Sequence, residues 1–242
     1  MFQWTADKIR FLRDAANYLS CYDRLAEQIS RYLSPDAHVC DAGCGLGHLS
    51  LALAAHCRQV TAIDWDPEAL QVLAEEQARR GLTNLHVRCG DIHRLAPKQP
   101  YQAMVFCSFG RPAEILSLAA AQCSGTVVAV KRRRVLHRFR LEAAPCQHGD
   151  FDLLRQQLTR RHIAFQQTSF SLEMGQPFRS LADAVLFFQA YAQSDAVITA
   201  DVILPHLQET DSPAFPYFLP RQQTMELLTF STAALASERT VL

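Results

Sequence analysis

The feature that most constrains this chain is a glycine-punctuated segment between residues 39 and 50. It reads Val-Cys-Asp-Ala-Gly-Cys-Gly-Leu-Gly-His-Leu-Ser, with glycines at the alternate positions 43, 45 and 47. The pattern is typical of a short buried strand, a tight turn and the first turn of a helix. Glycines let backbone amides approach a ligand that any side chain would block. The helix start directs free N–H groups and a positive dipole end at the same place. The segment therefore predicts a nucleotide-binding corner.

The residues around these glycines narrow the choice of ligand. His48 stands where the dinucleotide fingerprint Gly-x-Gly-x-x-Gly requires its third glycine. Asp41, at the end of the predicted strand, would repel a pyrophosphate and suits a ligand with a nearby positive charge, such as an amino group or a sulfonium. A nicotinamide-dependent oxidoreductase is therefore the less favoured interpretation.

The rest of the chain alternates between strand and helix patterns, which is typical of a doubly wound α/β fold. Strands are predicted over 37–41, 59–64, 85–89, 101–107, 125–130, 163–172 and 224–230. Helices are predicted over 5–33 in two segments, 48–56, 66–81, 112–122, 151–161, 180–191 and 199–207. Helical crossovers between the first five strands favour a parallel sheet.

We expect one domain over residues 1–242, with two additions to its core. Residues 1–35 form an N-terminal helical part, in which Ile9, Leu12, Ala16 and Leu19 make an apolar stripe. It either flanks the sheet or forms a lid over the ligand. Residues 36–174 form the Rossmann-like core, 175–222 a helical and proline-rich insertion, and 223–242 the last strand and tail. Insertions of this length often build a binding pocket.

Composition excludes several classes of function. Lys plus Arg and Asp plus Glu both total 24, so the whole chain has no electrostatic reason to bind nucleic acid or an anionic membrane. No apolar stretch is long enough to span a membrane, and the N-terminus lacks a secretory pattern. The eight cysteines have no metal-site spacing, so we expect free thiols, no metal and a cytoplasmic location.

Four segments on the strand ends together resemble the motifs of class I S-adenosylmethionine-dependent methyltransferases. Asp41-Ala-Gly-Cys-Gly-Leu-Gly47 looks like motif I, and Val60-Thr-Ala-Ile-Asp64 is similar to the second motif. Cys89-Gly-Asp-Ile92 is similar to the third, and Tyr101 to Phe109 occupies the place of motif IV. The resemblance covers about residues 37–131.

This resemblance implies a seven-stranded mixed sheet in the order 3-2-1-4-5-7-6, with an antiparallel last strand. It implies S-adenosylmethionine as cofactor and S-adenosylhomocysteine as product. Asp64 would bind the ribose hydroxyls, Asp91 would accept the adenine amino group, and Trp65 could offer the adenine an apolar face. The expected cofactor-binding residues are Asp41, Gly43, Cys44, Gly45, Gly47, Asp64, Trp65, Asp91, Ile92 and Cys107.

The acceptor is harder to predict. The motif IV position reads Cys-Ser-Phe-Gly-Arg-Pro over 107–112 and lacks the Asn/Asp-Pro-Pro-Tyr pattern of amino-methylating enzymes. A distinctive catalytic residue is not required, since methyl transfer depends largely on proximity and alignment. Weak candidates for a general base are His137, His148 and Tyr191. The candidate substrate-binding residues are Tyr18, Tyr22, Ser108, Phe109, Arg111, Lys131 and Arg132.

Two further segments bear on the acceptor. The basic run 131–134 starts at the end of the fifth strand, where it either continues into solvent or clamps an anionic acceptor. The aromatic residues of the insertion either line an apolar pocket or form its own core, and the loop 215–220 is a candidate substrate or partner surface. The sequence does not indicate the oligomeric state.

The sequence thus favours an enzyme that transfers a methyl group to a small molecule, with nucleic acid disfavoured by the neutral charge. Two alternatives stay open: a non-catalytic S-adenosylmethionine-binding module or partner subunit, and an RNA or protein methyltransferase.

Overall fold

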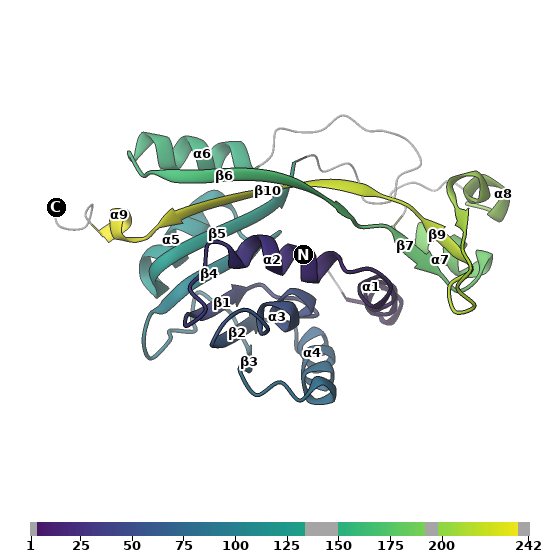
Figure 1. The fold of residues 1–242 in the computed structure, drawn as a ribbon, viewed down its shortest axis with the longest axis horizontal. Helices are drawn as coiled ribbons and strands as arrows, with labels where there is room; N and C mark the ends of the chain where they lie inside the picture. Colours follow the sequence, from purple (N-terminus) through teal and green to yellow (C-terminus); the bar gives the residue numbers. More distant parts are fainter. Residues whose placement is uncertain (1–3, 134–149, 192–197, 237–242) are drawn as a thin grey trace. The chain divides into compact units, whose positions relative to one another are not determined.

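The structure is a computed structural model that describes residues 4–133, 150–191 and 198–236 (Figure 1). The chain divides into two compact units. The larger unit contains residues 22–133, 148–170 and 225–242, and the smaller unit contains residues 1–21, 134–147 and 171–224. The predicted partition of a single domain at residues 35, 174 and 222 stays a prediction.

A seven-stranded sheet in the order β3-β2-β1-β4-β5-β10-β6 forms the centre of the larger unit (Figure 1). Its strands are β1 (His38–Ala42), β2 (Gln59–Asp64), β3 (Leu85–Cys89), β4 (Tyr101–Cys107), β5 (Cys123–Arg132), β6 (Phe165–Glu173) and β10 (Gln222–Ser231). Strands β1 to β5 pair in parallel, and β10 pairs antiparallel with β5. The predicted fold class, strand order and antiparallel last strand are confirmed.

The helices of the larger unit contact both halves of this sheet. They are α2 (Cys21–Ser30), α3 (His48–Leu53), α4 (Pro67–Arg80), α5 (Pro112–Gln122), α6 (Asp150–Arg160) and α9 (Ala233–Ala236). Helices α3 and α4 contact β2, whereas α5 contacts β4 and β5 and packs on α6. As predicted, α4 begins at an Asp66 cap and ends at Gly81, whose φ of 64° suits only glycine comfortably. Helix α3 ends earlier than predicted, at Leu53.

The connection between β3 and β4 lacks a helix: residues 90–100 form turns and irregular chain. Every other link between consecutive strands from β1 to β5 contains one, in agreement with the predicted ranges, which also place no helix between 89 and 101. Ile92 nevertheless lies buried in the main core cluster beside Ile115 and Leu116 of α5. The packing of this loop therefore depends on α5.

The smaller unit is assembled from segments far apart in the sequence. Its elements are α1 (Ala6–Tyr18), β7 (Gln176–Phe178), α7 (Leu181–Tyr191), α8 (Ala200–Ile203), the 3-10 helix η1 (Leu204–His206), β8 (Gln208–Glu209) and β9 (Tyr217–Leu219). A core of Phe11, Phe178, Phe187 and Phe188 joins α1 to β7 and α7. The rings of Phe11 and Phe187 lie 4.9 Å apart at 80°, an edge-to-face contact. These aromatic residues of the insertion therefore form its core.

Charged and polar side chains also join α1 to the segment that contains β7 and α7. Asp14 on α1 is buried at 4% exposure and accepts two hydrogen bonds from the Arg179 guanidinium, at 2.7 and 3.0 Å. Arg10 pairs with Asp183 at 2.6 Å. Gln176 donates to the Phe11 carbonyl at 3.0 Å. The N-terminal helix is thus an integral part of the smaller unit.

Three predictions for this unit agree with the structure only in part. The buried residues of α1 are Phe11, Asp14 and Ala15, and the predicted stripe beginning at Ile9 is only partly buried. The expected helix over 199–207 is shortened to α8 and η1. The expected loop over 215–220 contains β9, the middle strand of a β7-β9-β8 sheet, and its side chains are half-buried. The extended backbone of β9 satisfies groups that a loop would leave to solvent.

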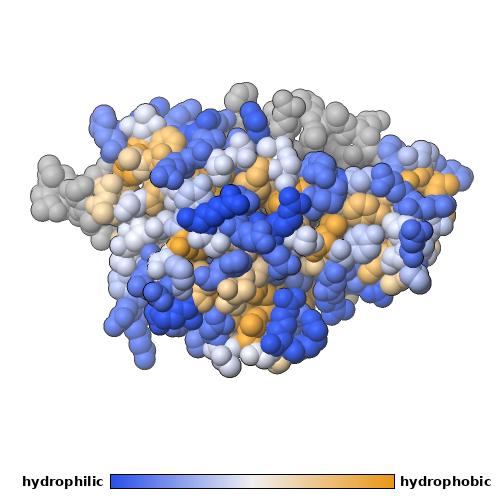
Figure 2. Space-filling view, viewed as in Figure 1, coloured by the Kyte–Doolittle hydropathy of each residue, from blue (hydrophilic) through white to orange (hydrophobic). Residues whose placement is uncertain are grey.

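The exterior is ordinary for a globular chain. The face in Figure 2 is mainly hydrophilic, with smaller hydrophobic areas between charged side chains. Across the described residues, every helix is too short or too polar to cross a membrane.

Candidate functional site

The glycine turn follows β1 and has the backbone shape that its sequence requires. Gly43, Gly45 and Gly47 have φ values of 69°, 55° and 71°, in the left-handed region that disfavours other residues. A Cβ at Gly43 would lie 2.1 Å from the Phe109 ring, and one at Gly47 would lie 2.3 Å from Leu73. Both conformation and space therefore exclude a side chain at these two positions.

Asp64 ends β2 and is tied directly to the glycine turn. One carboxylate oxygen accepts the Gly45 N–H at 2.8 Å, and the other accepts the Asp66 N–H at 3.0 Å. A carboxylate has about four lone-pair positions, so two hydrogen bonds leave capacity for ligand hydroxyls. Trp65 beside it is 49% exposed. The structure thus brings together the predicted ribose carboxylate and the predicted glycine turn.

Asp41 has a different environment, since its side chain is 2% exposed and accepts a hydrogen bond from the Ser50 hydroxyl at 2.5 Å. Burial, together with the smaller effect of the Asp64 charge, raises the pKa of Asp41 to about 6 against the lowering effect of the Ser50 hydrogen bond. A cation bound near the turn would lower this pKa again and favour the ionised carboxylate.

The loop after β3 carries the predicted adenine-side residues. Asp91 is exposed, and its side chain accepts the His93 N–H at 3.0 Å. Its carbonyl accepts the N–H groups of Arg94 and Leu95 at 2.9 and 3.0 Å. The carboxylate therefore orders its own turn, and it stays accessible from solvent.

The turn after β4 is held in a strained conformation. Ser108 has φ of 55°, uncommon for a residue other than glycine, and such outliers gather at functional sites. Its N–H donates to the Val130 carbonyl at 2.8 Å, and Lys131 Nζ donates to the Gly110 carbonyl at 2.5 Å. Phe109, from the same turn, packs its ring over Gly43. The acceptor-side turn and the glycine turn are therefore in direct contact.

The other predicted residues are distributed over both units. Tyr22 lies on α2, and its ring is 5.3 Å from that of His48 at the start of α3. Tyr18 contacts Phe215 and Phe218 within the smaller unit. Tyr191 also belongs to that unit, where its ring lies 4.9 Å from that of Phe187.

The roles of several candidate site residues stay predictions. The candidate bases His137 and His148 lie outside the described residues. Cys107 and Arg132, at the ends of β4 and β5, are half-buried, and Arg111 at the start of α5 is exposed. The roles predicted for these side chains, and for Tyr18, Tyr22 and Tyr191, are not tested by this geometry.

The described cysteines are all free thiols. Burial raises the pKa of the Cys44 thiol well above its ordinary value, so Cys44 is a small neutral residue of the glycine turn. Cys89 is exposed, unlike the buried Cys40 and Cys123. Among the described residues, histidine, cysteine and acidic side chains do not gather into a group that could hold a metal ion.

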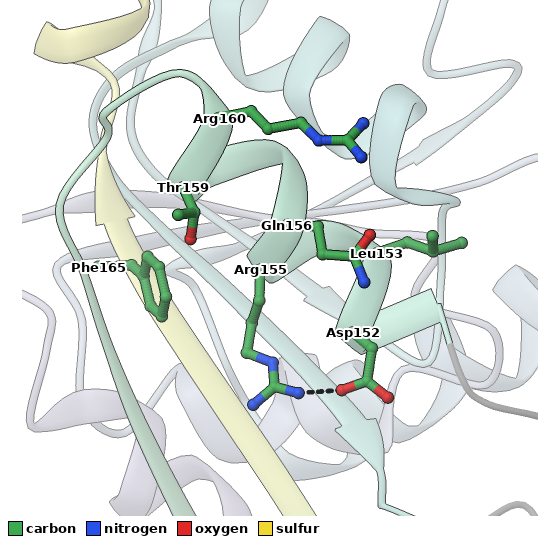
Figure 3. Close-up of a pocket in the computed structure, with 7 residues that line it drawn as sticks. All are labelled: Asp152, Leu153, Arg155, Gln156, Thr159, Arg160 and Phe165. Carbon is green, nitrogen blue, oxygen red and sulfur yellow. Dashed lines mark hydrogen bonds and ion pairs between the residues drawn. The ribbon is translucent and has the colours of Figure 1, made fainter.

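An open cavity of about 680 Å³ lies along α6, away from the glycine turn (Figure 3). Its lining residues are Asp152, Leu153, Arg155, Gln156, Thr159, Arg160 and Phe165. Arg155 is ion-paired with Asp152, as the dashed line in Figure 3 marks. The lining of the cavity includes none of the predicted cofactor residues, so the strand edge is the better candidate site.

A profile of the methyltransferase domain family matches residues 39–123. The match begins in β1 and contains the glycine turn, Asp64, the loop after β3 and the turn after β4. The chain contains a class I methyltransferase domain. The resemblance inferred from the four segments is thereby confirmed.

Solved structures with the same fold cover most of this chain at low identity. The YcgJ protein of Bacillus subtilis has a TM-score of 0.53 and 14% identity, over 86% of this chain and 97% of that protein. A putative methyltransferase of Bacillus halodurans has a TM-score of 0.52 and 14% identity, over the same shares. A precorrin 8W decarboxylase of Methanobacterium thermoautotrophicum has a TM-score of 0.51 and 18% identity, over 86% and 88%. These likenesses concern the fold of the methyltransferase domain.

Curated relatives match only short segments. An uncharacterized RNA methyltransferase of Enterococcus faecalis is 38% identical over 66 residues, which are 27% of this chain and 14% of the relative. One of a Nostoc species is 31% identical over 78 residues, which are 31% and 17%. The match thus spans less than a fifth of either relative's length.

The sequence analysis missed several residues that organise this site. Ser50 binds Asp41 nine positions away, with no signal in the pattern. Glu114 accepts the Arg111 N–H at 3.1 Å through its side chain. The third position of a helix is where a capping glutamate occurs, so this contact was predictable. His93 and Gln122 hold the loop after β3 and left no comparable signal.

Proposed function

We propose that the methyltransferase domain binds S-adenosylmethionine at the carboxyl edge of β1, β2 and β3 and transfers its methyl group to a small, anionic molecule. The observation that carries this proposal is the 2.8 Å hydrogen bond from the Gly45 N–H to Asp64. It joins the ribose carboxylate and the glycine turn into one rigid group before any ligand binds. Such preorganisation reduces the entropy lost on binding.

The described residues fit this cofactor. Asp64 retains acceptor capacity beyond its bonds to Gly45 and Asp66, and a cation bound near the turn would favour the ionised form of Asp41. When bound, S-adenosylmethionine supplies an electrophilic methyl group on a sulfonium sulfur. Asp64 would hold the ribose hydroxyls, and Asp91 the adenine amino group. The chain's main catalytic contribution is to hold donor and acceptor in line.

The anionic acceptor is supported by the charges beside the turn after β4. Arg111 begins α5, while Lys131 and Arg132 end β5, the neighbouring strand. Lys131 already donates to the Gly110 carbonyl. It therefore fixes the turn as well as adding positive charge, and Arg111 and Arg132 are the stronger candidates for binding a carboxylate or phosphate.

An RNA acceptor is the second candidate. It is favoured by the names of the two curated relatives, both described as RNA methyltransferases. The balanced charge of the chain counts against it.

Replacement of Asp64 tests the cofactor site. We expect Asp64→Ala to weaken S-adenosylhomocysteine binding in calorimetry by more than about 1.5 kcal/mol, since hydrogen bonds to a charged acceptor are lost. Asp66→Asn is the matched control, because it keeps the helix cap two residues away. Equal affinity of the Asp64 variant and the wild type would remove the ribose role from this residue.

Transfer of a radiolabelled methyl group from S-adenosylmethionine tests the acceptor. The chain is incubated with the low-molecular-mass filtrate, the RNA and the protein of an extract from the organism of origin. Label in an anionic component of the filtrate is expected, and label in RNA would support the second candidate. Cofactor binding without transfer to any fraction would favour a non-catalytic binding module.

A further inference from the structure

The loop after β3 and the turn after β4 lie on the two sides of the proposed cofactor site, and one helix contacts both. Since residues 90–100 contain no helix of their own, the loop needs support from elsewhere. Helix α5 begins directly after the turn, and its buried apolar residues belong to the same core cluster as Ile92. Two polar side chains of α5 add specific contacts to this packing.

Gln122, the last residue of α5, supports the loop near Ile92. Its side-chain nitrogen donates to the Ile92 carbonyl at 2.7 Å, and the amide is 5% exposed. Glu114, in the first turn of α5, supports the loop at His93, the residue that follows Ile92. Its Oε1 lies 2.6 Å from Nε2 of His93. A carboxylate can only accept, so the His93 ring carries its proton on Nε2.

The second carboxylate oxygen of Glu114 contacts the turn after β4. Oε2 accepts the Arg111 N–H at 3.1 Å, at the end of the turn that begins with Ser108. One carboxylate therefore binds both segments. Burial raises the pKa of Glu114, but the hydrogen bonds from His93 and Arg111 outweigh it and leave the pKa below its ordinary value. Glu114 is thus ionised at neutral pH and accepts from both donors at once.

The turn is otherwise fixed from the β5 side, by the Ser108 N–H bond to Val130 and by the bond from Lys131 to Gly110. The contact to Glu114 differs from these because it also leads to the loop after β3. Both segments also adjoin the main core cluster, which contains Ile92 and against which Leu95 and Phe109 pack. The Glu114 carboxylate thus adds a specific polar connection to this apolar one, and the turn that it reaches carries the Phe109 ring over Gly43.

We infer that Glu114 is a positioning residue that couples the adenine-side loop to the acceptor-side turn, so that binding at one side orders the other. The inference rests on the proposed function in one respect, which is that the loop faces the adenine and the turn faces the acceptor. The coupling between the two segments does not rest on it, because it follows from the contacts of Glu114 alone.

Hydrogen exchange of the ligand-free chain tests the coupling. In Glu114→Ala, the Arg94 and Leu95 amides should exchange at least about tenfold faster, equivalent to about 1.4 kcal/mol of local stability. In His93→Ala, the Ser108 and Arg111 amides should exchange faster, because Glu114 loses the contact that restrains its carboxylate. Glu68→Ala is the control, since Glu68 is an exposed glutamate in the first turn of α4. Wild-type exchange at 108–111 in His93→Ala would overturn the proposal.

Glu114→Gln and Glu114→Met keep the test open if the alanine variant does not fold. The glutamine amide can accept the Arg111 N–H with its oxygen and donate its NH2 group to Nε2 of His93 in the other ring tautomer, so exchange in this variant should stay near wild type at both segments. Glu114→Met has a similar bulk but only a weak acceptor, so exchange should rise at both segments. Unchanged exchange in Glu114→Met would show that the bridging carboxylate is dispensable, and would overturn the proposal. A purely structural role would instead lower the melting temperature and raise exchange throughout the larger unit.

A titration with S-adenosylhomocysteine separates this inference from the proposed function. In the wild type, the ligand should slow exchange in both segments. In Glu114→Ala, it should still slow exchange at 91–95 and leave 108–111 unaffected. Protection of both segments in the variant would overturn the coupling, whereas absence of binding to the wild type would overturn the proposed function and leave the ligand-free result standing.

Discussion

The polar contacts of the glycine turn and those that hold α1 in the smaller unit span different sequence distances. In the larger unit, Asp41, Asp64 and Asp91 lie at or just after the carboxyl ends of three strands that are consecutive along the chain. Their partners lie nearby in sequence, as with Asp41 and Ser50. In the smaller unit, Asp14 and Arg179 are 165 residues apart. Strand ends that meet at one edge of a sheet can be inferred from one sequence, whereas a pair as distant as Asp14 and Arg179 cannot.

The largest expected effect tests the tight packing of the larger unit. Gly43→Ala combines a left-handed backbone, which costs about 1–2 kcal/mol, with overpacking against Phe109, which costs about 1–3 kcal/mol. We therefore expect urea unfolding to show a loss of about 2–5 kcal/mol, together with loss of cofactor binding. Gly81→Ala is the control, because Gly81 has a φ of 64° but nothing within 4 Å of an added Cβ. An equal loss in both variants would mean that backbone strain alone fixes the turn.

The next effect concerns Asp41, whose pKa in the folded chain is about 6. Because this pKa is above the ordinary value of 3.8, the native state binds more protons than the unfolded state between those values. Stability therefore falls as pH rises from about 4 to 6. Asp41→Asn removes the cost of ionising a buried carboxyl group, so it should stabilise the ligand-free chain by about 3 kcal/mol at pH 8 and by much less near pH 4. Its cofactor affinity should fall.

Unfolding at both pH values measures this effect, with Asp23→Asn, an exposed position on α2, as the control. A destabilised Asp41→Asn at pH 8 would mean that the hydrogen bond from Ser50 outweighs burial. Site residues in the larger unit would then contribute to stability in the same way as the charge pairs of the smaller unit.

The smallest of the three effects is in the smaller unit. Asp14→Ala removes two charge-assisted hydrogen bonds from Arg179, so we expect a loss of about 2–3 kcal/mol. The expected loss of stability is moderate because the Arg179 side chain is 52% exposed and can return to water. Asp7→Ala is the control, since Asp7 pairs with Arg10 at the surface and should change stability by less than about 0.5 kcal/mol. Limited proteolysis of the smaller unit measures the difference, and equal susceptibility would remove the special role of the buried pair.

Local signals were enough to predict most of the larger unit. The bounds of β2, β3, β4 and α5 agree with the predicted ranges, because alternating strand and helix patterns are bounded by clear caps and turns. The strand order and the antiparallel β10 came from the resemblance. The proximity of Asp64 to the glycine turn was expected from parallel strands that end at one edge.

The smaller unit was predictable only in part. The helix α7 was indicated by its Ser180 cap, whose hydroxyl accepts the Asp183 N–H at 3.1 Å. The buried face of α1 was predicted wrongly because Asp14 reads as a surface residue until Arg179 is placed beside it. The strand β9 was missed because the prolines around it indicated a loop and its partners β7 and β8 are only three and two residues long. Such pairings depend on the tertiary structure.

The distance between Asp14 and Arg179 also sets an order of events on the ribosome. Strands β1 to β5 lie within one uninterrupted stretch of chain, so their contacts can begin to form as soon as that stretch has emerged. Helix α1 is synthesised before these strands, yet the contacts of Phe11 and Asp14 with residues 176–188 cannot form until that segment has left the ribosome. During most of translation, the apolar and acidic face of α1 is therefore open to chaperones, and a chain that stops before β7 leaves it so permanently.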